Sequence, residues 1–260
     1  MSAKNLLFIG AGNMGGAFIR GLLKHETHQI TVVDPAKPNF DAVTVLSHIK
    51  EFDGPTPDAV ILAVKPQIME QVVSALREKI YDSLVISIAA GKKIAFFQGI
   101  LGKNARIIRA MPNLPAAIGE GMTCWVGNHN LGQRDKETAH EILRGAGQVH
   151  ELQEESAVDS WTAIAGSGPA FVFHFLECLS LAAEKLGFNK ELSDLLAIQT
   201  TLGSAKLVKE LNDEFITLRE SVTSPGGTTA AGLAVLMEKL PELLVQTSLA
   251  AHQRSVELSG

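Results

Sequence analysis

The spacing of apolar residues divides the chain into two regions that meet near residue 153. In the first region, short and nearly continuous apolar runs predict strands covered on both faces, at 6–10, 30–34, 59–64, 84–89 and 106–110. Apolar residues with helical spacing lie between these runs, at 14–24, 68–79 and 94–101. Strands that alternate with helices predict right-handed crossovers, and therefore a parallel, doubly wound sheet.

The second region has no strand-like run, and its pattern predicts helices over 156–187, 190–212 and 228–258. Residues 170–186, AFVFHFLECLSLAAEKL, are apolar nearly all the way round a helix. Such a helix must be buried on every side. About a hundred residues are too few to bury that much apolar surface within one chain. We therefore expect this region to dimerise, with the helices of two subunits interleaved.

Composition excludes several classes of protein. The chain of 260 residues carries a formal net charge of −5 and only 5% aromatic residues, which argues against a nucleic-acid partner. Cys124 and Cys178 lie far apart and fit no metal-ligand spacing, so no metal site is expected. No apolar run approaches the roughly 18 residues of a membrane span or the pattern of a signal peptide. We expect a cytoplasmic protein with no membrane partner.

The segment FIGAGNMGG, residues 8–16, places Gly10, Gly12 and Gly15 in G-x-G-x-x-G spacing. Such glycines allow a tight turn, close approach of the backbone to a pyrophosphate, and close packing of helix on strand. The segment follows a predicted strand and opens a predicted helix, and Asp34 closes the next strand about 20 residues on. These features indicate a dinucleotide site, with the phosphates at the start of the helix.

The fold class that follows is α/β. We expect an N-terminal Rossmann-type doubly wound parallel sheet over 1–153, which binds the dinucleotide. An all-α C-terminal domain is expected over 154–260, for dimerisation and substrate binding.

Further candidate residues follow three other predicted strands, because ligands of open α/β sheets bind at the carboxyl ends of strands. These segments are AVKPQ at 63–67, SIAAG at 87–91 and RAMPNLP at 109–115. Lys65 is either a phosphate or ribose contact or a solvated lysine, and the residues alone leave both readings open. Asp34 suits a ribose 2′-hydroxyl and repels a 2′-phosphate, but Lys37 could offset that repulsion, so the residues leave NADH and NADPH open as well.

The segment SPGGTTAAG, residues 224–232, interrupts the helical region. Pro225 and the two glycines end one helix, and a threonine can begin the next. Glycines let successive N–H groups point into one concavity, which would hold an anion at a helix start. The same residue types also suit a plain capping loop, and spacing alone does not separate the two readings.

Six motifs in this order resemble those of the pyrroline-5-carboxylate reductase family. They are the glycine-rich turn at 10–14, AVKP at 63–66, SIAAG at 87–91, RAMPNLP at 109–115, AGSGPAF at 165–171 and SVTSPGGTTAAG at 221–232. The resemblance covers essentially the whole chain and implies reduction of the C=N bond of 1-pyrroline-5-carboxylate to L-proline, the last step of proline biosynthesis. It implies NADPH as donor, with NADH possible, and a homodimer that can assemble into a ring of dimers.

The resemblance also assigns residues. Cofactor contacts are implied at Gly10, Gly12, Asn13, Met14, Val64, Lys65 and Ala90, to which the motifs themselves add Ala11, Asp34, Pro66 and Asn113. Contacts to pyrroline carboxylate or proline are implied at Ser224, Gly227, Thr228, Thr229 and Glu155. Thr229 is the candidate catalytic residue, as a donor that positions and polarises the imine nitrogen. The chain departs from many relatives at Asp34, where they carry a smaller or uncharged residue.

Three alternatives are weighed against this assignment. A β-hydroxyacid dehydrogenase would place a catalytic lysine early in the first C-terminal helix, and AGSGPAFVFHFLE at 165–177 has none. An imine reductase acting on another substrate would share the whole constellation. A regulatory protein that binds NAD(P) without turnover would keep the glycine-rich turn and could dispense with the anion-binding bend.

Overall fold

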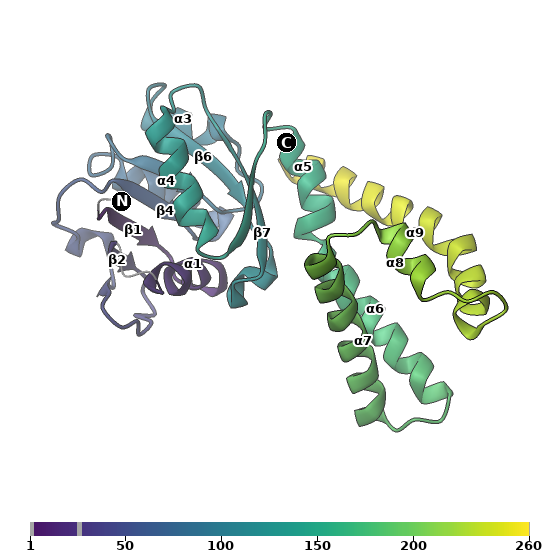
Figure 1. Ribbon diagram of the computed structural model, residues 1–260. Coiled ribbons are helices and arrows are strands. Elements are labelled where there is room, and N and C mark those ends of the chain that lie inside the picture. The colour runs from purple at the N-terminus through teal and green to yellow at the C-terminus, as the bar shows by residue number, and fades with distance from the viewer. Residues whose placement is uncertain (1–2, 25–27, 260) are drawn as a thin grey trace. The chain divides into compact units, whose positions relative to one another are not determined.

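The computed structural model describes residues 3–24 and 28–259, which form two compact units (Figure 1). The first unit comprises residues 1–167 together with 251–260, and the second comprises residues 168–250. Each unit is described by itself. The predicted domain boundary after residue 153 stays a prediction.

The first unit is built on an eight-stranded sheet in the order β3-β2-β1-β4-β5-β6-β7-β8. The strands are β1 (Asn5–Ile9), β2 (Gln29–Val33), β3 (Thr44–Leu46), β4 (Ala59–Leu62), β5 (Leu84–Ser87), β6 (Arg106–Met111), β7 (Gly121–Gly127) and β8 (Gly147–Glu151). All neighbouring strands are parallel except β6 and β7. The strand order reverses between β1 and β4, so this Rossmann-type sheet has its ligand crevice at the carboxyl ends of those two strands.

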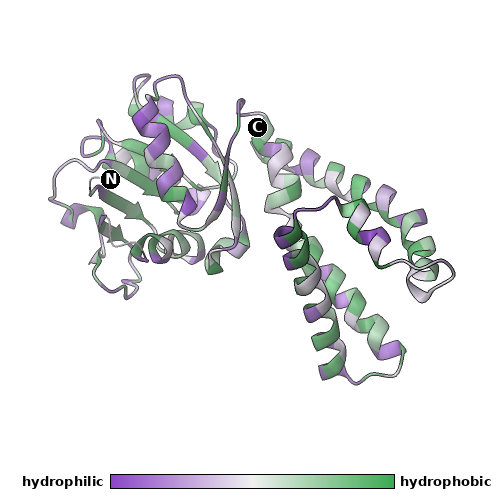
Figure 2. Cartoon of the chain, viewed as in Figure 1, coloured by the Kyte–Doolittle hydropathy of each residue, from purple (hydrophilic) through white to green (hydrophobic). Residues whose placement is uncertain are grey.

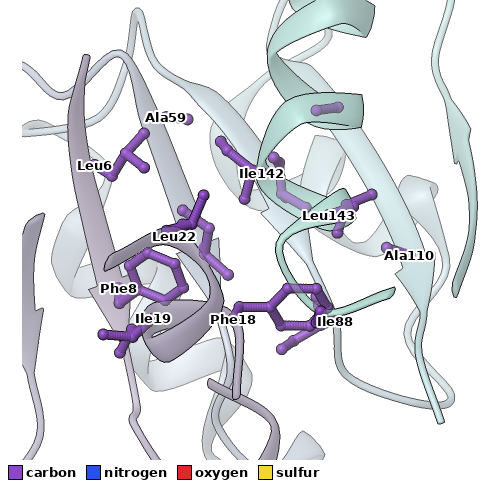
Figure 3. Close-up of a cluster of buried hydrophobic side chains, with 14 of the residues drawn as sticks. Leu6, Phe8, Phe18, Ile19, Leu22, Ala59, Ile88, Ala110, Ile142 and Leu143 are labelled. Atoms are coloured by element: carbon purple, nitrogen blue, oxygen red, sulfur yellow. The ribbon is translucent and has the colours of Figure 1, made fainter. Parts of the chain in front are cut away.

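Two apolar layers cover the two faces of the sheet, because successive strand residues point to opposite faces. Leu6 and Phe8 of β1 pack against α1 (Asn13–Leu23) and α4 (Gln133–Arg144), as Figure 3 shows. On the other face, Leu7 and Ile9 pack with residues of α2 (Met69–Leu76) and α3 (Ile94–Leu101). This double cover explains why the central strands read as continuous apolar runs.

The second unit contains only helices among its described residues. They are α6 (Gly168–Lys185), α7 (Lys190–Leu211), α8 (Phe215–Ser221) and most of α9 (Thr228–Ser259). Gly187 has φ +103° and Asn212 φ +53°, so left-handed residues follow α6 and α7 near the breaks that the sequence predicts. The short helix α8 is not among the predicted elements.

Large apolar side chains are exposed along all four helices of the second unit. Figure 2 shows hydrophobic residues, coloured green, along these helices. Leu186 is 81% exposed and Phe215 is 77% exposed. Residues 157–185 are long and apolar enough to cross a membrane by length and composition alone, and only 6% of the tested window is buried. Apolar surface on this scale requires a cover that a single chain does not supply.

Gly21 in α1 provides a test of the packing between α1 and the end of α4. A Cβ atom at Gly21 would lie 1.8 Å from the carbonyl oxygen of Gly145. We expect Gly21→Ala to lower the free energy of unfolding by about 1–3 kcal/mol, which is the usual effect of an added group in a tightly packed core. Chemical denaturation measures this value.

Gly99→Ala is the matched control, since Gly99 lies inside α3 with nothing within 4 Å of its added Cβ. It should stabilise the protein by about 0.5–1 kcal/mol, because alanine has the better helix propensity. A Gly21→Ala variant as stable as the parent would contradict the described packing.

Candidate active site

The glycine-rich turn connects β1 to α1 at the point where the strand order reverses. Gly10 has φ +92°, and a Cβ there would lie 2.8 Å from the carbonyl oxygen of Ala63. A Cβ at Gly15 would lie 2.3 Å from the carbonyl oxygen of Gly10. These two glycines are required by packing within the chain, which brings α1 close to the sheet.

Gly12 differs from them. A Cβ at Gly12 would meet nothing within 4 Å, so no packing in the chain requires a glycine there. Gly12 precedes Asn13, the first residue of α1, whose first N–H groups have no partner within the helix. The open space at Gly12 and these N–H groups together suit a pyrophosphate.

Asp34 follows β2 and braces this turn. Its Oδ2 accepts a hydrogen bond from the N–H of Ala11 at 2.8 Å, and its Oδ1 accepts one from the N–H of Ala36 at 2.8 Å. The N–H of Gly10 donates to the carbonyl oxygen of Val33 at 2.9 Å. The carboxylate therefore lies at the turn, where a dinucleotide would place its adenosine ribose.

Other predicted cofactor residues lie at the same edge of the sheet. Val64, Lys65 and Pro66 follow β4, and Lys65 is exposed at the start of a short 3₁₀ helix (Pro66–Ile68). Ala90 is exposed in the loop after β5. Parallel strands end at one edge, so the structure brings these residues to the edge that carries the glycine-rich turn.

Asn113 has a structural role that the sequence did not reveal. It is only 9% exposed, and its Nδ2 donates to the carbonyl oxygen of Ala165 at 3.0 Å. Its Oδ1 accepts from the N–H of Met122 at 2.9 Å. Both ends of the side chain thus tie the segment after β6 to β7 and to a π-helical turn (Thr162–Gly166), whose last two residues begin the AGSGPAF motif. A contact between Asn113 and the cofactor stays a prediction.

Glu155 is also held by protein groups. Its Oε1 accepts a hydrogen bond from the N–H of Ile94, the first residue of α3, at 2.8 Å. The same oxygen lies 3.1 Å from Nη1 of Arg109. Arg109 is only 3% exposed. The carboxylate stabilises the start of α3 and pairs a buried guanidinium. The predicted substrate contact at Glu155 stays a prediction, and any such contact would have to share this carboxylate.

The remaining predicted substrate residues form an exposed bend in the second unit. Gly226 has φ +69°, and the N–H of Gly227 donates to the carbonyl oxygen of Ser224 at 3.0 Å. A Cβ at Gly227 would lie 2.5 Å from Oγ of Ser224, so this turn requires a glycine. Thr228 begins α9, so Thr228 and Thr229 present N–H groups that have no partner in the helix. Both threonines are exposed.

One of the two cysteines lies inside the sheet. Cys124 is fully buried in β7, and burial raises its thiol pKa to about 12. A thiol with such a pKa stays protonated at neutral pH, so it does not act as a nucleophile. Within the described residues, no group of three or more His, Cys, Asp or Glu side chains could hold a metal ion.

Comparison with known proteins identifies the family. The family model described as pyrroline-5-carboxylate reductase dimerisation matches residues 155–258. A pyrroline-5-carboxylate reductase of Aquifex aeolicus is 38% identical, with 89% of this chain and 88% of the relative covered. That of Pasteurella multocida is 38% identical, with 99% of this chain and 98% of the relative covered. The chain belongs to the pyrroline-5-carboxylate reductase family.

Solved structures agree with this assignment. The structure of a pyrroline-5-carboxylate reductase from Coxiella burnetii is 34% identical, with a TM-score of 0.92 and full coverage of both chains. The Plasmodium falciparum pyrroline carboxylate reductase, solved with NADP bound, is 31% identical, with a TM-score of 0.87 and full coverage of both. A family model described as NADP oxidoreductase coenzyme F420-dependent matches residues 5–91, which contain the glycine-rich turn. The predicted family and the predicted fold class are confirmed.

Glu155→Gln tests the structural role of that carboxylate. Glutamine can still accept from the N–H of Ile94 but leaves the buried Arg109 without its counter-charge. We expect a loss of about 2 kcal/mol in the free energy of unfolding, measured by chemical denaturation without ligands.

The control is Glu154→Gln, which removes the same charge from an exposed neighbour and should change stability by less than about 0.5 kcal/mol. If Glu155→Gln left stability unchanged and instead raised KM for the substrate, the carboxylate would be a substrate contact.

Proposed function

We propose that this chain reduces the C=N bond of 1-pyrroline-5-carboxylate with NAD(P)H and releases L-proline. The observation that carries the proposal is the full-length similarity, at 34–38% identity, to pyrroline-5-carboxylate reductases. The glycine-rich turn and the bend at 224–229 supply the two binding surfaces that this reaction needs, one for a dinucleotide and one for an acid.

The cofactor surface consists of the glycine-rich turn, Asp34 and the ends of β4 and β5. The free N–H groups at the start of α1 would hold the pyrophosphate, and the open space at Gly12 would admit it. Lys65 is exposed beside this surface and would contact phosphate or ribose. When bound there, NAD(P)H supplies the hydride.

The substrate surface is the bend from Ser224 to Thr229. The N–H groups of Thr228 and Thr229 lie at the start of α9, where a helix dipole favours an anion by about 0.3–1 kcal/mol, and more when the site is buried. Ser224 adds a hydroxyl donor. In this proposal the bend holds the carboxylate of the substrate, which fixes the orientation of its ring.

Thr229 acts on the imine. Its hydroxyl would donate a hydrogen bond to the ring nitrogen, which makes the adjacent carbon a better hydride acceptor. Reduction adds a hydride to that carbon, and the nitrogen of the neutral imine gains one proton. A substrate that binds already protonated needs no dedicated general acid, and the hydroxyl of Thr229 then accepts a hydrogen bond from the ring N–H⁺ and positions it. In that case the pH profile of turnover follows protonation of the substrate as well as that of side chains.

The quaternary structure follows from the exposed apolar helices. A second copy of the chain would cover α6 to α9, as a dimerisation domain requires. In this proposal residues 1–153 bind the cofactor and residues 154–260 dimerise and bind the substrate. Assembly of the homodimers into a ring, and a location in the cytoplasm, belong to the same proposal.

Mixing the purified protein with pyrroline-5-carboxylate and a reduced nicotinamide tests the activity. We expect loss of nicotinamide absorbance with formation of L-proline, measured by spectrophotometry and chromatography. Binding of the cofactor without turnover on this substrate would contradict the proposal and favour a regulatory role.

Thr229→Ala tests the assigned catalytic residue. We expect kcat to fall by about 100-fold, as loss of one positioned hydrogen-bond donor does, with the Kd of the reduced cofactor unchanged. Thr229→Ser keeps the hydroxyl and should retain most of the activity. An equal loss of cofactor affinity in Thr229→Ala, or no rescue by serine, would reject the role.

A further inference from the structure

We infer that this chain prefers NADH over NADPH, because Asp34 is fixed where the ribose 2′ position of the donor would lie. The inference rests on the proposed reductase function and names its donor. Family membership leaves this choice open, since the Plasmodium falciparum relative was solved with NADP bound.

The carboxylate of Asp34 is held in place. Each of its oxygens accepts one main-chain hydrogen bond of 2.8 Å, from the N–H of Ala11 and from the N–H of Ala36. A tight turn follows, in which the N–H of Lys37 donates to the carbonyl oxygen of Asp34 at 3.0 Å and Pro35 fixes its own φ. The carboxylate cannot swing away without losing both bonds, one of which braces the glycine-rich turn.

The carboxylate of Asp34 can still accept further hydrogen bonds. A carboxylate has about four acceptor positions, so two remain after the amide bonds of Asp34 are made. These can accept hydrogen bonds from the ribose hydroxyls of NADH. A 2′-phosphate offers only acceptors and carries about −1.5 to −2 charges, so it would be repelled at the same position.

Few cations close in sequence could offset a 2′-phosphate beside Asp34. Lys37 is the only lysine or arginine between residues 28 and 46, and it is the first candidate to neutralise such a phosphate. Its charge acts on Glu51. The pKa of that carboxyl is lowered by a hydrogen bond from Ser47 and, in smaller part, by the charges of Lys37 and His48. Lys37 is itself exposed, so water and salt screen the attraction that it can offer a phosphate.

Binding of NADH and of NADPH, followed by fluorescence without any pyrroline substrate, tests the inference separately from turnover. We expect the parent protein to bind NADH at least 10-fold more tightly than NADPH. Asp34→Ser and Asp34→Asn should each lower this ratio by at least 10-fold, and asparagine keeps an acceptor for the N–H of Ala11. The ratio of kcat/KM for the two donors should shift in parallel.

Asp41→Ser is the matched control, because it removes the same charge from an exposed position in the same connection between β2 and β3. It should leave the ratio of the two affinities unchanged. Equal or tighter binding of NADPH by the parent protein would overturn the inference, and so would an unchanged ratio in both Asp34 variants. A protein that binds NADH preferentially but does not reduce pyrroline-5-carboxylate would retain this inference while contradicting the proposed reaction.

Discussion

The close approach of α1 to the sheet, at the turn from Gly10 to Gly15, is the contact on which the cofactor surface depends. The turn fits because side chains are absent at Gly10 and Gly15, where a Cβ would collide with main-chain oxygen atoms at 2.8 and 2.3 Å. The same turn places the N–H of Ala11 on Asp34 and sets Gly10 against the end of β4. One packing constraint thus aligns the proposed phosphate site, the proposed ribose site and the Lys65 segment along one edge of the sheet.

The second unit depends on a different constraint, which is the need to cover apolar surface. Its helices carry large apolar side chains on faces that nothing in their own chain covers. In the family to which the chain belongs, the matching region is described as a dimerisation region. Residues 157–185 have the length and apolar composition of a membrane span, and a helix that packs against a second chain would need the same apolar residues on every side.

Much of this architecture could be predicted from local patterns. The predicted central strands and the helices α1, α3, α7 and α9 agree with the structure to within a few residues, because each carries a strong periodic or continuous apolar signal. The helix α4 was missed because its sequence, QRDKETAHEILR, is mostly polar. The edge strand β8, GQVHE, was missed because it has no fully buried residue. The antiparallel pairing of β6 and β7 follows from a connection too short for a crossover, but β7 had to be recognised first.

The candidate site was less accessible to sequence reasoning. Motif spacing indicated the glycine-rich turn and the bend at 224–229, because both depend on local backbone conformation. Motif spacing could not indicate that Glu155 accepts a hydrogen bond from the N–H of Ile94, which is 61 residues away in the sequence. It also could not indicate that Asn113 donates to the carbonyl oxygen of Ala165, which is 52 residues away. Such bonds depend on the register of the sheet and on the path of the chain after it, which a linear pattern does not record.

The most direct test of this account is a crystal structure of the protein with oxidised cofactor and L-proline. We expect the proline carboxylate to accept hydrogen bonds from the N–H groups of Thr228 and Thr229, and the ring nitrogen to lie within hydrogen-bond distance of Oγ1 of Thr229. Proline bound at another surface, with the bend free of ligand, would contradict it.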